Sequence, residues 1–253
     1  MSNFEEEFQR FQPVIRALSR ISILGKKIVV RGEENFVREG PNIIVGNHCG
    51  SFKDVATLFR SVPRPFFFTA NKMIFSKADF NFLVRKHLKR HLKDLGVLLN
   101  FLLIPFKSLF VTYVSSNIAK IGTIPVDLYY LGKRGAIERC QDYLKAGRAI
   151  AALQGRGRVV PQDPNPYVKS FGRGTAIIAY NVLEQQGIRV PVTPLAIYGT
   201  QLPLFIPGKI LVNVGPAMFV SDYLGGGLDE SVTRFKEALE SRVKELFLEL
   251  IRL

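Results

Sequence analysis

Residues 45–54 are Val45-Gly46-Asn47-His48-Cys49-Gly50-Ser51-Phe52-Lys53-Asp54. They join an apolar run at residues 42–45, typical of a buried strand, to residues 55–59, which have the composition of a helix. Open α/β folds place their chemistry at such strand-to-helix junctions. Histidine accepts protons near neutral pH, and a carboxylate can fix its tautomer and orientation. We therefore expect His48 and Asp54 to form a catalytic pair.

The composition predicts a folded protein with an anionic partner. The 253 residues suffice for one α/β domain with a sizeable core. Hydrophobic residues make up 47% of the chain, and 35 Lys and Arg against 21 Asp and Glu give a formal charge of +14. An excess of this size favours binding to anions. On charge alone, nucleic acid, an anionic membrane surface and an acidic carrier protein all remain open.

The two cysteines, Cys49 and Cys140, have no paired spacing. This argues against a disulfide scaffold or a zinc site, and we expect no metal. The acidic N-terminus, Glu5-Glu6-Glu7, lacks the basic start of a signal peptide. We therefore expect the protein to stay in a reducing compartment.

Apolar runs alternate along the chain with helix-like segments. We expect strands at residues 27–32, 42–45, 66–70, 121–127, 148–153, 190–197 and 209–214. We expect helices at residues 54–60, 135–145, 176–185 and 229–251. This alternation predicts an α/β fold with a mixed, mostly buried central sheet flanked by helices. Because no repeat or low-complexity linker is visible, residues 1–253 are predicted to form a single domain.

The N-terminal segment, residues 1–27, is predicted to contain an amphipathic helix. Its apolar positions recur at steps of three and four: Phe4, Phe8, Phe11, Ile15 and Leu18. Such a helix either packs on the core of its own domain or lies in a membrane interface. The sequence leaves both interpretations open.

A second candidate for membrane contact is an insertion at residues 80–118. A dense basic run at 85–93 leads into an apolar stretch at 95–114, which Asn100, Pro105 and Lys107 interrupt. We expect two short interfacial helices here, because the proline and the lysine disfavour a continuous span. An anionic leaflet attracts neighbouring basic residues by roughly 1 kcal/mol each. The alternative is a solvated charged helix followed by a buried hairpin.

A basic glycine loop follows the predicted strand at 148–153. Its sequence is Gln154-Gly155-Arg156-Gly157-Arg158. Exposed amides and guanidinium groups suit a phosphate, and a solvated basic turn is the alternative. Because this loop and His48 both follow strands, we expect them at the same edge of the sheet. Gly172-Arg173-Gly174, before the next helix, would add amides and a helix N-terminus to the same anion.

The order of these segments resembles the glycerolipid acyltransferase family. Over residues 28–220 the chain contains Asn-His-…-Ser-Phe-Lys-Asp, then Gly-Thr-Ile-Pro-Val-Asp, then the Gly–Arg loop, then Val-Pro-Val-Thr-Pro-Leu-Ala-Ile. The resemblance implies that His48 is a general base and Asp54 its orienting partner. It implies acyl-CoA or acyl-carrier protein as co-substrate, with no further cofactor. Together with the basic and apolar segment at 85–114, it leads us to expect a membrane-associated protein, at the cytoplasmic face of a membrane.

The same resemblance implies the substrate-binding residues. The anionic head of a lysophospholipid or related lipid acceptor would lie near residues 154–158. The expected contacts are Asn47, Ser51, Gln154, Gly155, Arg156, Gly157, Arg158 and Arg173.

The sequence departs from the family pattern at three places. Five residues separate His48 from Asp54 where the family has four, and one residue on a helix is a rotation of ~100°. We expect the loop to absorb this residue at Gly50. Leu128 replaces the usual arginine of the second motif. Gln154 replaces the usual glutamate of the third, which keeps hydrogen bonding but removes a negative charge.

Three other functions compete with acyl transfer as interpretations of this sequence. Ser51 with His48 and Asp54 could form a hydrolase triad, but such triads normally assemble from distant segments. The altered motifs are also compatible with a degenerate acyltransferase-like protein that only binds lipid. Nucleic-acid binding is not expected, because the basic run adjoins an apolar segment and no binding module is recognisable.

Overall fold

The computed structural model describes residues 3–50, 52–86, 104–120, 122–126, 133–154, 168–202 and 206–252. The chain divides into two compact units, one of residues 13–67 and 137–253 and the other of residues 1–12 and 68–136. That residues 1–253 form a single domain stays a prediction.

Within the described residues, seven strands form one mixed sheet in the order β1-β7-β6-β2-β5-β3-β4. The strands are β1 (Lys26–Arg31), β2 (Asn42–Asn47), β3 (Phe66–Asn71), β4 (Thr123–Val126), β5 (Ala149–Gln154), β6 (Val192–Tyr198) and β7 (Gly208–Val214). β2 pairs in parallel with β5 and with β6, whereas β6 and β7 are antiparallel. The predicted α/β fold with a mixed central sheet is confirmed.

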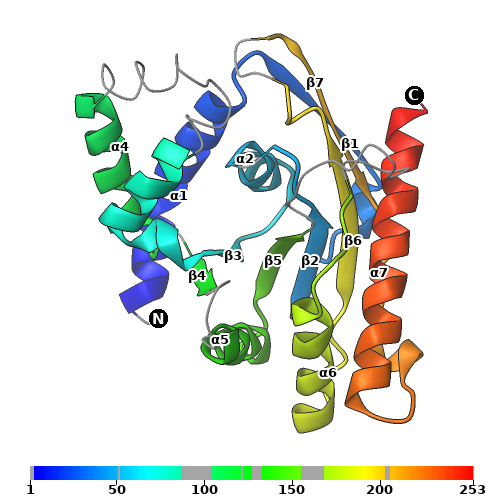
Figure 1. The fold of residues 1–253 in the computed structure, drawn as a ribbon. Helices are drawn as coiled ribbons and strands as arrows, with labels where there is room; N and C mark the ends of the chain where they lie inside the picture. The colour runs from blue at the N-terminus through cyan, green and yellow to red at the C-terminus, as the bar shows by residue number, and fades with distance from the viewer. Residues whose placement is uncertain are drawn as a thin grey trace. The chain divides into compact units, whose positions relative to one another are not determined.

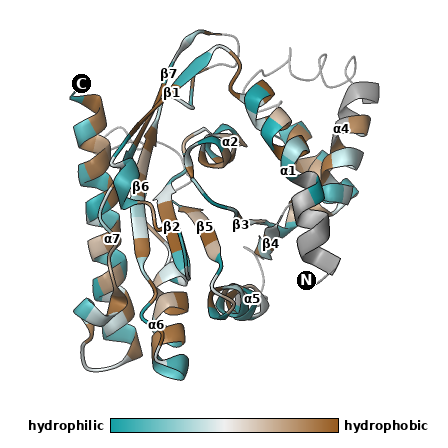
Figure 2. Ribbon diagram, turned by 180° about the vertical axis from the view of Figure 1, so that it is seen from behind, coloured by the Kyte–Doolittle hydropathy of each residue, from teal (hydrophilic) through white to brown (hydrophobic). Residues whose placement is uncertain are grey.

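Strand β2 lies in the middle of the sheet because its residues suit burial on both faces. Ile43, Ile44 and Val45 are fully buried, and continuous β-branched apolar runs are typical of parallel strands covered on both sides. Figure 2 shows hydrophobic residues along β2 and β5. A Cβ atom on Gly46 would lie 2.5 Å from Leu195 Cδ1, so β2 and β6 approach closely at this glycine. A glycine at this position therefore leaves room for Leu195 near the carboxyl end of β2.

Four helices accompany the sheet: α2 (Phe52–Ser61), α5 (Lys133–Lys145), α6 (Gly174–Gln186) and α7 (Leu228–Ile251). Each predicted boundary is confirmed to within two residues. α7 runs along β6 and buries an apolar stripe that includes Phe235, Leu239 and Val243. α2 lies on the other side of the sheet from α7 (Figures 1 and 2). Both faces of the site-bearing strands are thus covered.

The predicted N-terminal helix is confirmed as α1 (Asn3–Ser22). Its residues 13–22 belong to the same unit as most of the sheet. There Ile15 is buried, whereas Leu18 and Ile21 keep 46% and 66% of their surface exposed. Within residues 13–22, the apolar side of the helix is therefore only partly covered by the protein itself.

The other unit contains β4, which pairs with the end of β3, and the helix α4 (Ile104–Asn117). A further helical segment covers residues 77–86. Phe82, Leu109 and Tyr113 expose 56%, 71% and 42% of their surface. Residues 87–103, the middle of the predicted interfacial insertion, lie outside the described residues, so the insertion stays a prediction. No helix in the described ranges combines the length and the apolar character needed to cross a bilayer.

Candidate active site

Three loops leave the sheet at the same edge. The parallel register of β2 and β5 sets Asn47 beside Gln154, and His48 follows β2 directly. β6 is also parallel to β2, so residues 199–202 begin at this edge too (Figure 1). The expectation that His48 and the start of the Gln154 loop share an edge is confirmed. In open α/β sheets, the carboxyl ends of the strands are where ligands bind.

His48 and Asp54 are in direct contact. His48 Nδ1 lies 2.8 Å from Asp54 Oδ2, which fits a hydrogen bond donated by the Nδ1–H tautomer. Asp54 is fully buried in the first turn of α2, where the helix dipole favours a negative charge. The His48 side chain is 16% exposed. With Nδ1 engaged, Nε2 is the ring nitrogen left to accept a proton.

The buried Asp54 carboxylate has donors on both oxygens. Oδ2 also accepts from the Gly50 N–H at 2.7 Å, and Oδ1 accepts from the hydroxyl of Thr200. Burying a charge is costly unless it is paired and hydrogen-bonded, and these donors offset that cost. The sequence did not single out Thr200, although its place three residues after the predicted strand at 190–197 puts it near the same edge.

Gly50 is the residue at which the longer loop passes Thr200. A Cβ atom on Gly50 would lie 2.3 Å from Thr200 Cβ, so only glycine fits without displacement. α2 begins at Phe52, and the extra residue between His48 and Asp54 is therefore absorbed before the helix starts. The expectation that the loop and not the helix absorbs it is confirmed. Ser51 lies outside the described residues.

Gln154 connects the end of β5 to the start of α6. Its Nε2 donates to Thr175 Oγ1 at 2.8 Å, and its Oε1 accepts from the Gly172 N–H at 2.9 Å. An amide suits this place because it donates on one side and accepts on the other. Residues 155–158, the expected phosphate-binding glycines and arginines, lie outside the described residues.

Arg173 is occupied by a partner on α7. Its Nη2 lies 2.5 Å from Asp229 Oδ1, and the two side chains are 47% and 90% exposed. An ion pair this exposed is weak, so the guanidinium can exchange Asp229 for another anion. Arg173 thus follows Gly172 directly in the chain. The Gly172 N–H donates to Gln154, whereas the Arg173 guanidinium pairs with Asp229 on α7.

Comparison with known proteins identifies the fold. No family model and no curated protein matches the chain. A solved structure does. The chain is similar to the crystal structure of the 1-acyl-sn-glycerophosphate (LPA) acyltransferase PlsC from Thermotoga maritima, with a TM-score of 0.55 and 19% identity. The similarity covers 99% of this chain and 84% of PlsC. The predicted α/β fold is thereby matched by a solved acyltransferase structure.

On this PlsC-like fold, Asn47 ties two strand ends together. Its Nδ2 donates to the Ile197 carbonyl at 2.9 Å, and its Oδ1 accepts from the Ile197 N–H at 2.7 Å. Asn47 is fully buried. The side chain expected to contact substrate therefore holds the end of β2 against β6, which fixes the backbone that carries His48.

Cys49 lies next to the carboxylate as a neutral thiol. Burial first, and then the charge of Asp54, raise the pKa of Cys49 to about 12. Its Sγ is 3.3 Å from Thr200 Oγ1 and 3.6 Å from the Ile197 carbonyl oxygen. Because the thiolate is the reactive form, Cys49 is not an activated nucleophile at neutral pH, and His48 is the group suited to proton transfer.

Lys53 supports the same edge from α2. The residue is 8% exposed and its ammonium donates to the Leu202 carbonyl. Burial first, and then the nearby Lys26 charge, lower its pKa. Among the side chains that the structure describes, no group of three or more His, Cys, Asp or Glu comes together in a way that could hold a metal ion.

Proposed function

We propose that the protein is a membrane-associated O-acyltransferase. It transfers a fatty acyl group from an acyl thioester to a hydroxyl of a lysophospholipid or related anionic lipid. The observation that carries the proposal is the hydrogen bond between His48 and the buried Asp54, at the carboxyl edge of a sheet with the fold of PlsC. The sequence resemblance to glycerolipid acyltransferases supports the same chemistry.

His48 acts as the general base in the proposed mechanism. With Nδ1–H donated to Asp54, Nε2 takes the proton of the acceptor hydroxyl while the hydroxyl oxygen attacks the thioester carbonyl. The new C–O bond forms and the C–S bond breaks. The imidazolium then returns its proton to the departing sulfur, which leaves as a free thiol. Asp54 stabilises the imidazolium, and general-base assistance of this kind contributes about 10²- to 10⁴-fold.

The basic loop after β5 supports an anionic acceptor. Gln154, the residue that precedes this loop in the sequence, lies beside Asn47 in the sheet register, and Asn47 directly precedes His48. Arg156 and Arg158 are the cations of that loop in the sequence. Guanidinium groups suit phosphate and carboxylate. Both proposed donors, acyl-CoA and acyl-carrier protein, also carry negative charge.

Exposed apolar side chains next to the site support a membrane-facing edge. Phe52, Leu202 and Ile206 are 56%, 39% and 50% exposed. Two lysines bind the backbone of these residues: the Lys53 ammonium donates to the Leu202 carbonyl, and the Lys26 ammonium donates to the Ile206 carbonyl. Phe52 and Lys53 belong to the start of α2, and Leu202 and Ile206 to the β6–β7 connection. Both segments leave the same edge of the sheet as His48.

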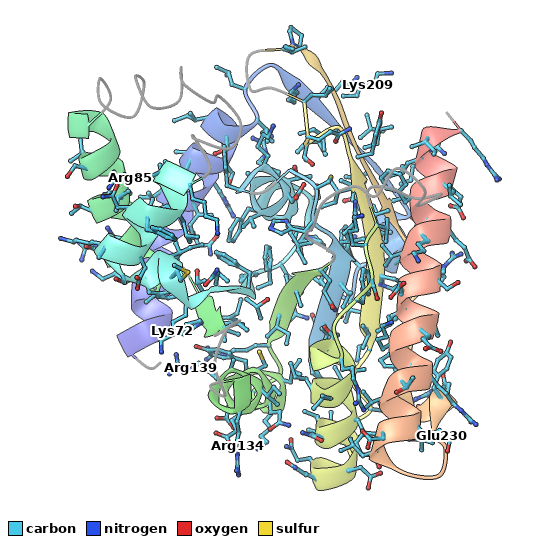
Figure 3. The ribbon with its side chains drawn as sticks, in the orientation of Figure 1. Lys72, Arg85, Arg134, Arg139, Lys209 and Glu230 are labelled. Atoms are coloured by element: carbon cyan, nitrogen blue, oxygen red, sulfur yellow. The ribbon has the colours of Figure 1, made fainter. Side chains whose placement is uncertain are left out.

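The turn between α1 and β1 adds to this edge. The Gly25 carbonyl accepts a hydrogen bond from the Gly208 N–H at the start of β7. Next to it, Leu24 is 65% exposed and Ile21 66%. Exposed cations accompany them: Arg20, Lys27 and Lys209, the last of which is labelled in Figure 3. Residues 13–32 contain no acidic side chain. Apolar side chains among cations suit an anionic bilayer.

The proposal is tested with purified protein and anionic vesicles that carry a panel of lysophospholipids. Acyl-CoA or acyl-carrier protein is added, free thiol is followed by absorbance, and the lipid product is identified by mass. We expect thiol release that depends on the lipid acceptor. His48→Ala should reduce it by at least about 100-fold while the protein stays folded and still sediments with the vesicles.

Three results would contradict the proposal. If His48→Ala turns over as fast as the wild type, His48 is not the base. If the wild type binds anionic vesicles but releases no thiol with any donor and acceptor, the protein is a lipid-binding module on an acyltransferase-like fold. Binding to RNA or DNA in preference to vesicles would point to a different partner altogether.

A further inference from the structure

Thr200 is a fully buried hydroxyl that the reaction described above does not use directly. It follows β6 by two residues, and 146 positions separate it from Asp54 in the sequence. Its Oγ1 donates to Asp54 Oδ1, and both residues are fully buried. The contact therefore links the β6–β7 connection to the carboxylate that holds His48.

The donors are divided between the two oxygens of Asp54. His48 Nδ1 and the Gly50 N–H approach Oδ2, at 2.8 and 2.7 Å. Oδ1 accepts from Thr200, while Cys49 Sγ lies 4.0 Å away, at the limit for a weak thiol contact. A carboxylate can rotate about its Cβ–Cγ bond, because terminal torsions of this type are soft. Thr200 is the strong donor that resists this rotation from the Oδ1 side.

The turn that carries Thr200 is itself fixed. Gly199 has φ = 95°, a left-handed conformation that favours glycine, and a Cβ there would lie 2.2 Å from the Lys209 carbonyl oxygen. The Gly199 N–H donates to Gln201 Oε1 at 2.9 Å. On the opposite side, the backbone of Gly50 packs directly against Thr200. The hydroxyl is therefore delivered by a backbone that has little freedom to move.

We propose that Thr200 is a positioning residue, whose hydroxyl holds the Asp54 carboxylate in the orientation that keeps His48 in its Nδ1–H tautomer. Its effect on turnover rests on the proposed function, whereas its effect on the tautomer does not. Without the hydroxyl, Oδ1 is buried without its strong donor, and the carboxylate rotates to recover one. The bond to His48 Nδ1 then weakens, and Nε2 loses its preference as the acceptor nitrogen.

The experiment compares Thr200→Val and Thr200→Ser in the full-length protein labelled with ¹⁵N-histidine. The chain has only three histidines, and His48→Ala assigns the signal of His48. We expect the ¹⁵N shifts of the wild type to report the Nδ1–H tautomer. Thr200→Val should give a mixture of tautomers, and Thr200→Ser should restore the wild-type pattern. Where turnover is measurable, Thr200→Val should lower kcat on the order of 10- to 100-fold with a smaller change in KM.

Thr193, on strand β6 itself, provides a matched control. It is also fully buried, but its hydroxyl donates to Asn42 Oδ1 at 3.2 Å, at the far end of β2 from His48. Thr193→Val removes a buried threonine hydroxyl without touching Asp54. We expect it to leave the tautomer and kcat unchanged, whatever it does to the unfolding temperature.

The measured tautomer of His48 tests the proposal independently of any enzyme assay. An unchanged His48 tautomer in Thr200→Val overturns it, even if kcat falls, because the loss of activity is then merely structural. If Thr200→Val does not fold, Thr200→Ala is labelled instead, and retention of the pure Nδ1–H tautomer there overturns the proposal too. A wild type that releases no thiol, but in which the tautomer responds as expected, contradicts the proposed function and supports the role of Thr200.

Discussion

Replacing Gly50 with alanine is expected to disturb the site, and the distances from the added Cβ atom to its neighbours show how far the backbone must move. The new Cβ would lie 2.3 Å from Thr200 Cβ, 2.4 Å from its Oγ1 and 2.7 Å from its carbonyl carbon. Ordinary contacts between carbon atoms are about 3.5–4.0 Å. The two segments must therefore separate by about 1 Å or more, and a side-chain rotation cannot relieve the contact with the Thr200 backbone.

This separation is expected to lower both the stability of the fold and the rate of turnover. Overpacking a tight interior site typically costs about 1–3 kcal/mol. The same displacement moves the Gly50 N–H and the Thr200 hydroxyl, two of the donors that hold Asp54. Misplacement of catalytic groups by about 1 Å can lower turnover about 10²-fold. We therefore expect Gly50→Ala to fold with reduced stability and to lose nearly all activity.

The measurements are urea unfolding and thiol release from the acyl donor. Gly135→Ala is the control, because Gly135 lies exposed in α5 and a Cβ there meets nothing within 4 Å. That change should be neutral or stabilise the protein by up to about 1 kcal/mol. If Gly50→Ala keeps both the unfolding midpoint and the turnover of the wild type, the loop relaxes freely and the tight packing against Thr200 has no function.

Two further predictions concern charged and ionisable groups. Burial alone would raise the pKa of Glu240, but hydrogen bonds from the Phe171 N–H, Lys244 and Lys236 lower it from 4.5 to about 2. Glu240 therefore stabilises the fold above about pH 4.5 and loses this effect as pH falls toward 2. The difference in Tm between wild type and Glu240→Gln should shrink over that range, and a pH-independent difference would refute this. The pKa of Cys49, about 12, predicts that iodoacetamide at pH 8 labels it about 10³-fold more slowly than an ordinary thiol. Mass spectrometry should find it labelled in urea, and rapid labelling of the folded protein would contradict the prediction.

The elements of the fold were predictable because their signals are local. The continuous apolar run at residues 42–45 predicts a strand that is buried on both faces, and β2 is indeed fully buried. The apolar residues of 229–251 recur with the period of a helix, and this determines which side of α7 packs against the sheet. His48 and Asp54 were predictable for the same reason, since six positions of sequence separate them and a single strand-to-helix junction brings them together.

The support of the site was not predictable, because it depends on long-range topology. Thr200 reaches Asp54 only because β6 pairs with β2, and Asn47 meets Ile197 for the same reason. No local pattern marks either contact. Arg173 likewise is a basic residue before a helix in the sequence, and its partner Asp229 is 56 positions away. Such contacts are set by strand order, which a single sequence does not encode in any short motif.

The spacing between His48 and Asp54 shows where a sequence rule stops applying. A rotation of ~100° per residue holds only on a continuous helix, and α2 begins at Phe52, four residues after His48. The extra residue therefore does not turn the carboxylate away from the imidazole. It lies in a loop whose Gly50 N–H donates to the same oxygen that holds His48. The longer loop thus gives Asp54 a backbone donor, and Thr200 occupies the space that glycine leaves open. A five-residue spacing is compatible with the pair because these two residues fit each other.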